Sequence, residues 1–172
     1  RNTKLNSGDI FGQLLIHYEI SMQTVIIKRS LLIAENLNFD VSLKYSPDYN
    51  LFMKIASQYP VGVMKKAIGK YRLVQNSLSD KSLSIAGQEM KFTLDFIFES
   101  SEHLRNKYSD EFKVSYDKCH YYDAVAHLVN KDRERAHKEL HPIIRARYEY
   151  LILYLLIRLF FPIAIILKIL GR

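Results

Sequence analysis

A long apolar run near the C-terminus constrains this chain more than any other feature of its sequence. Every residue from 151 to 167 is apolar or aromatic except Arg158, and Pro162 lies inside the run. A helix of this length extends about 25 Å, slightly less than the ~30 Å hydrocarbon core of a bilayer. A spanning helix would also place Arg158 near mid-bilayer, at a cost of ~3 kcal/mol or more. An in-plane helix at the membrane interface is therefore favoured over a spanning one.

Basic and aromatic side chains form a stripe along this predicted helix. At the helical repeat, Arg147, Arg158 and Lys168 fall on one arc with Tyr150 and Tyr154. Such a stripe lets the Arg and Lys side chains reach lipid headgroups while the other faces stay apolar. We therefore expect residues 143–172 to form an apolar basic helix that contacts a membrane through its three cations. The alternative is a core helix packed on the rest of the domain.

Charge and metal-binding residues narrow the possible partners. The net charge is +7, but no run of five or six basic residues occurs, which favours an anionic membrane or phosphate-bearing substrates over nucleic acid. An ordinary basic, solvated surface is the alternative. The single cysteine, Cys119, excludes a disulfide scaffold and indicates a reducing compartment. His137 and His141 have a metal-binding spacing, but Pro142 follows and the H-E-x-x-H glutamate is absent, so no metal site is expected.

The remaining sequence predicts an α/β domain followed by a helical extension. β-Branched or apolar runs predict strands at 24–27, 61–63 and 67–73. Helices are predicted from about residue 10, over 30–38, from Pro47 until Pro60, and over 84–108. Two further helices are predicted within 116–140, with a break at Asn130.

Several blocks of the N-terminal half occur in an order that resembles the second half of the catalytic domain of family 2 glycosyltransferases. They are TVIIKRSLL at 24–32, FDVSL at 39–43, DYNLFMKIA at 48–56, YPV at 59–61 and KYRLVQNSLS at 70–79. The resemblance implies a GT-A fold and inverting transfer of a sugar from a nucleotide donor. It implies that residues 1–80 form the acceptor-side half of a GT-A domain and that residues 81–142 form a helical extension.

The same resemblance implies roles for individual residues. Asp48 matches the general base that takes the proton of the acceptor hydroxyl, which is a poor nucleophile until a carboxylate is positioned beside it. The other implied site residues are Met22, Gln23, Thr24 and Tyr49 on the acceptor side and Arg72 beside the donor phosphates.

The family's nucleotide-binding half and its D-x-D metal site lie upstream of every matched block, and no D-x-D occurs in this chain. We therefore expect the chain to be a C-terminal fragment that is inactive alone. Its parent would bind Mg²⁺ or Mn²⁺, which spreads the charge of the leaving diphosphate. It would use a nucleotide sugar and a glycan or lipid-linked acceptor in cell-surface polysaccharide synthesis, at the cytoplasmic face of the membrane. The alternative is a non-catalytic membrane-associated helical adaptor, with residues 84–172 as the functional part.

Overall fold

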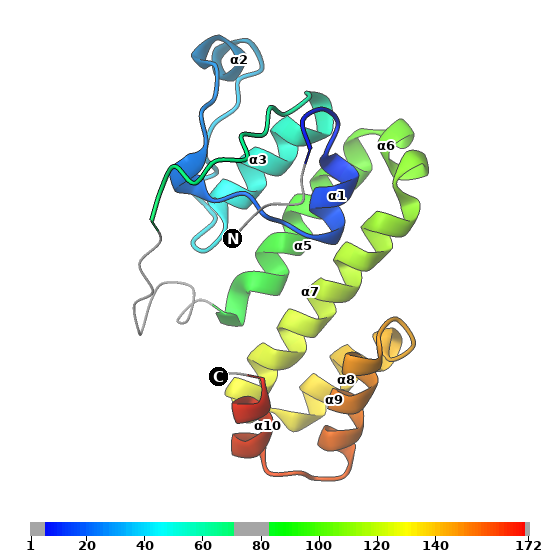
Figure 1. The fold of residues 1–172 in the computed structure, drawn as a ribbon. Helices are drawn as coiled ribbons and strands as arrows, with labels where there is room; N and C mark the ends of the chain where they lie inside the picture. The colour runs from blue at the N-terminus through cyan, green and yellow to red at the C-terminus, as the bar shows by residue number, and fades with distance from the viewer. Residues whose placement is uncertain (1–5, 71–82, 171–172) are drawn as a thin grey trace.

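The computed structural model of the chain describes residues 6–70 and 83–170 and contains nine α-helices in that part (Figure 1). Of these described residues, 66% are helical and none belongs to a strand. The expected α/β class is therefore wrong. The identification as the C-terminal part of a GT-A glycosyltransferase is also wrong, because that fold requires a sheet.

The helices differ greatly in length and gather around one long helix, α7. Their bounds are α1 Phe11–Ile16, α2 Arg29–Ala34, α3 Pro47–Gln58, α5 Leu83–Ser100, α6 Glu102–Lys107, α7 Ser109–Val129, α8 Arg133–Leu140, α9 Tyr148–Arg158 and α10 Ile163–Ile169. Two 3₁₀ turns, η1 Met22–Thr24 and η2 His141–Ile143, complete the set. Figure 1 shows α1, α3 and α5 near the first half of α7 and α8–α10 near its end, while α2 projects from the N-terminal part.

Two separate hydrophobic cores share α7. The N-terminal core joins α1, α3, α5 and the first half of α7 and includes the buried side chains of Phe11, Met53 and Leu94. The C-terminal core joins the last turns of α7 to α8–α10 and includes Leu128 and Ile157. Burying a side chain of this size contributes about 1.5–3 kcal/mol. Since α7 places Phe112 in the N-terminal core and Leu128 in the C-terminal core, it contributes to the stability of both.

The predicted strand at 24–27 is absent, although its residues favour strands. Met22–Thr24 forms the turn η1, and Ile26 is 94% exposed. β-Branched residues stabilise a strand by packing on a neighbouring strand and a core face. The described residues supply neither here. The predicted strand at 61–63 is reduced to one antiparallel bridge between Gly8 and Val61, and the prediction at 67–73 lies partly outside the described residues.

Several helix boundaries are confirmed. Helix α3 begins with Pro47 and ends before Pro60, as the fixed φ of proline and its missing N–H require. The break at Asn130 separates α7 from α8, and the Asp132 side chain accepts the N–H of Arg135 as the N-cap of α8. The single helix predicted over 84–108 is divided, because Ser101 caps a new helix, α6.

The C-terminal tail forms two helices where one was expected. Helix α9 ends at Arg158, and α10 begins at Ile163 after Pro162. Proline cannot continue a helix because its ring blocks the preceding turn. Within residues 6–70 and 83–170, no helix combines the length and apolar character that crossing a bilayer requires.

Candidate functional site

Asp48 lies in the first turn of α3, and the loop that leads to it is held by Glu89 of α5. The Glu89 carboxylate accepts the backbone N–H groups of Lys44 at 2.7 Å, Tyr45 at 3.0 Å and Ser46 at 2.8 Å. It also accepts the Ser46 hydroxyl at 3.0 Å. A helix N-terminus favours a carboxylate in its first turn, so the fold places a half-buried Asp48 on a fixed backbone.

The buried Glu89 carboxylate is stabilised in its charged form. Burial raises the pKa of Glu89, but hydrogen bonds from the backbone of Lys44, Ser46 and Tyr45 outweigh burial and lower the pKa. The charged Glu89 carboxylate is therefore the acceptor for three successive backbone N–H groups in the loop before α3.

Tyr18 and Tyr49 lie beside Asp48 as part of the N-terminal core. Their rings meet edge to face with centroids 4.9 Å apart, and neither buried hydroxyl has a hydrogen-bond partner among the described residues. Burial, and then the nearby charge of Asp48, raises the pKa of Tyr18. Burial also raises the pKa of Tyr49. Because Tyr49 is only 7% exposed, it packs in the core and does not face an open acceptor pocket.

The other residues implied by the resemblance lie on an exposed turn or outside the described residues. Met22, Gln23 and Thr24 form the exposed turn η1, and Arg72 lies outside the described residues. An open groove of about 340 Å³ lies elsewhere, lined by α5, α7 and η2 residues such as Phe98, and Asp48 does not line it. No group of three or more His, Cys, Asp or Glu side chains among the described residues could hold a metal ion, so these residues offer no Mg²⁺ or Mn²⁺ site.

The three predicted membrane-contacting cations are distributed over the C-terminal helices. Arg147 precedes α9 and pairs with Glu149 at 3.1 Å. Arg158 ends α9 and Lys168 lies on α10; both are exposed and make no ion pair with the described residues. The predicted single stripe is thus divided between two helices.

The strongest surface feature is a set of exposed apolar side chains on this tail, which we call the apolar tip. Its members, all more exposed than a core side chain by a wide margin, are Tyr148, Leu151, Ile152, Leu155, Leu159, Phe160, Phe161, Ile165 and Ile169. The α9 members lie within an arc of about 100° on one side of the helix. Leu153 and Ile157 on the opposite side fill the C-terminal core. Helix α9 is therefore apolar on both its buried and its exposed side.

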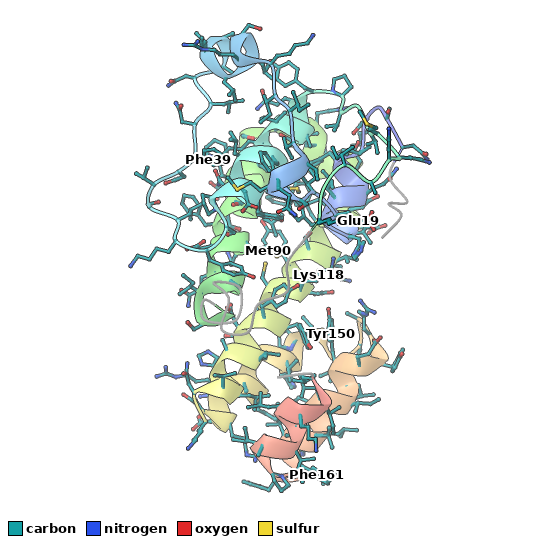
Figure 2. The ribbon with its side chains drawn as sticks, turned by 60° about the vertical axis from the view of Figure 1, so that its left-hand side comes forward. Glu19, Phe39, Met90, Lys118, Tyr150 and Phe161 are labelled. Carbon is teal, nitrogen blue, oxygen red and sulfur yellow. The ribbon has the colours of Figure 1, made fainter. Side chains whose placement is uncertain are left out.

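The turn at the end of α9 presents the most exposed of these side chains. Leu159 is 73% exposed and Phe160 81% exposed. The N–H of Phe160 donates to Ile157 O at 3.2 Å and that of Phe161 to Leu156 O at 3.0 Å, which is the pattern of a Schellman motif. Phe160 occupies the left-handed position of this motif, with φ 56°. Figure 2 shows Phe161 at the end of the molecule far from Phe39.

Sequence reasoning missed this turn and Arg133, which binds it. The Arg133 guanidinium donates to Ile157 O at 2.9 Å and Phe161 O at 2.6 Å. A signal was present, because two aromatic residues stand directly before Pro162. A single helix over 143–172, as predicted, contains no turn at these residues.

Comparison of the chain with known protein families, with characterised proteins and with solved structures finds no match.

Proposed function

We propose that this chain is a peripheral membrane-binding helical module whose apolar tip enters the surface of an anionic bilayer. The observation that carries the proposal is the turn Leu159–Phe161, which exposes three large apolar side chains between two helices that are themselves apolar on their outer sides. Contiguous exposed apolar surface of this kind is typical of interaction sites.

The backbone of Phe160 gives independent support. The left-handed position of a Schellman motif favours Gly, and a residue with a Cβ there is disfavoured by about 1–2 kcal/mol. Phe160 gains little burial in return, because most of its ring is exposed. A large aromatic side chain at this position is expected if its ring is buried by something outside the chain.

Charge favours a lipid surface as the partner. After Glu149 the sequence contains no Asp or Glu, and the exposed Arg158 and Lys168 lie on either side of the turn Leu159–Phe161 in the sequence. Each such cation near an anionic leaflet contributes about 1 kcal/mol. A symmetric contact between two copies would instead bring the same cations together, which opposes self-association through this surface.

The test is sedimentation with vesicles of phosphatidylcholine alone or mixed with phosphatidylglycerol. We expect binding to the mixed vesicles that weakens with salt. The double change Phe160→Ser and Phe161→Ser should weaken binding at least about tenfold, since burying one such ring contributes about 1.5–3 kcal/mol. The matched control is Ile26→Ser, which removes an apolar side chain that is 94% exposed in the N-terminal part.

Two results would contradict membrane binding. One is equal binding by the Phe160/Phe161 double variant and the Ile26 variant. The other is a concentration-dependent dimer in analytical ultracentrifugation that the double variant abolishes, because a second copy would then be the partner.

A second candidate is sugar transfer from a nucleotide-sugar donor to a glycan or lipid-linked acceptor, with Asp48 as general base. The observation that favours it is the half-buried Asp48 carboxylate, which follows a loop held by Glu89 and lies beside the unpartnered hydroxyl of Tyr18. A general base needs such a held carboxylate. The described residues offer no metal site, so donor binding would depend on other parts of a complete enzyme.

This second candidate is tested by a transfer assay on the protein expressed from its complete reading frame, with nucleotide sugars, Mg²⁺ and membrane lipids as acceptors. Asp48→Asn should abolish transfer, while Asp40→Asn, on the exposed loop before α3, should not. Sugar transfer by the Asp48→Asn protein would contradict the role of Asp48 as general base.

A further inference from the structure

One arginine joins both sides of the apolar turn. Arg133 is the first residue of α8. Its Nη1 donates to Ile157 O in the last turn of α9 at 2.9 Å, and its Nη2 donates to Phe161 O at 2.6 Å. Its guanidinium also lies 5.6 Å from the centre of the Phe160 ring. The planar, forked guanidinium suits this double contact, which a single-point donor cannot reproduce.

Arg133 is the donor to the Phe161 carbonyl, for which the described residues show no backbone donor, and it adds a second donor to Ile157 O, which also accepts the Phe160 N–H at 3.2 Å. The last carbonyls of a helix have no intrahelical donor, and the carbonyl of Phe161 lies between α9 and α10. Water satisfies such groups in solution, but the bilayer interior does not, and an unsatisfied carbonyl there is strongly disfavoured. Arg133 supplies a donor to the Phe161 carbonyl from within the protein.

The neighbours of Arg133 leave its guanidinium free for this task. Asp132 pairs with Arg135 at 3.2 Å, and Glu134 pairs with Lys138 at 2.6 Å. The acidic side chains beside Arg133 are thus engaged with other cations, and its fork is directed at the turn.

We propose that Arg133 is the positioning residue of the membrane-binding turn: it holds Leu159–Phe161 in the inserting geometry and satisfies the Phe161 carbonyl when insertion removes that group from water. This inference rests on the proposed membrane binding and assigns that surface a specific determinant.

The chain contains no Trp, so Phe160→Trp places a single tryptophan on the turn. Its emission on vesicles with phosphatidylglycerol, and its quenching by brominated lipids, report insertion depth. In this background we expect Arg133→Gln to weaken binding about tenfold and to make the Trp shallower, because charged hydrogen bonds are lost. Arg133→Lys should recover only part, since it keeps the charge without the fork. Arg145→Gln, the same charge change at an exposed arginine of the C-terminal part, is the control.

The outcomes separate the two proposals. If the Trp emission of the Phe160→Trp protein does not shift on any vesicle, membrane binding by the turn fails and this inference fails with it. If the emission shifts but Arg133→Gln matches Arg145→Gln in affinity and depth, only the role of Arg133 is overturned. Where Arg133→Gln does not fold by circular dichroism, Arg133→Lys decides: full recovery of depth and affinity overturns the need for the fork.

Discussion

Glu89 of α5 holds Ser46, the residue before α3, through two hydrogen bonds, from the Ser46 N–H at 2.8 Å and from its hydroxyl at 3.0 Å. The two residues are 43 positions apart in the chain. This contact fixes the start of α3 against α5 and so sets the backbone that carries Asp48.

Glu89→Gln should lower the free energy of unfolding by about 1–3 kcal/mol, because the amide group has one acceptor where the carboxylate has two and its NH₂ faces N–H donors. Urea unfolding followed by circular dichroism measures the change. Glu99→Gln, an exposed glutamate on the same helix, should change stability by less than about 0.5 kcal/mol. Equal effects of the two changes on stability would contradict a stabilising role for the Glu89 hydrogen bonds.

The Glu89 contribution should depend on pH with a definite sign. The pKa of Glu89 in the folded chain lies below its ordinary value of 4.5. The stability that it contributes is therefore fully present above that value and is lost as pH falls through the lower folded pKa. The difference in unfolding free energy between the native chain and Glu89→Gln should narrow as pH falls below the ordinary value of 4.5. A difference that stays constant down to acid pH would contradict a charged Glu89.

Gly87→Ala should destabilise the packing of α5 on α7. A Cβ at Gly87 would lie 2.7 Å from the backbone oxygen of Cys119, which cannot move without shifting α7. Overpacking of this kind costs about 1–3 kcal/mol in thermal or urea unfolding. Gly62→Ala is the control, because a Cβ there meets nothing within 4 Å. If Gly87→Ala is as stable as that control, the two helices are less closely packed than described.

Phe160→Gly should change stability and membrane binding in opposite directions. Glycine relieves the left-handed backbone at φ 56° and should raise the free energy of unfolding by up to about 1 kcal/mol. The same change removes an inserting ring and should weaken vesicle binding. Asn36→Gly, at φ 49°, should gain less, because Asn tolerates this region. A lower free energy of unfolding in Phe160→Gly would show that the Phe160 ring stabilises the folded chain.

Local sequence signals predicted helix ends well and strands poorly. Pro47, Pro60 and Asn130 act through their own backbone and caps, so their effects were visible in the sequence. The β-branched residues at 24–27 act only through a neighbouring strand, and the described residues place none beside them. The resemblance to glycosyltransferases inherited the same weakness, since it assumed a sheet that those residues do not form.

The sequence alone determined that the tail is apolar, cationic and interrupted by Pro162, because composition and proline geometry are local properties. Only the tertiary structure decided which tail residues face outward. Leu153 and Ile157 are as apolar as Leu159, yet they are buried in the C-terminal core while Leu159 is exposed. The hydrogen bond from Arg133 to Phe161, 28 residues later in the chain, likewise depends on the packing of α8 against α9, which no local pattern contains.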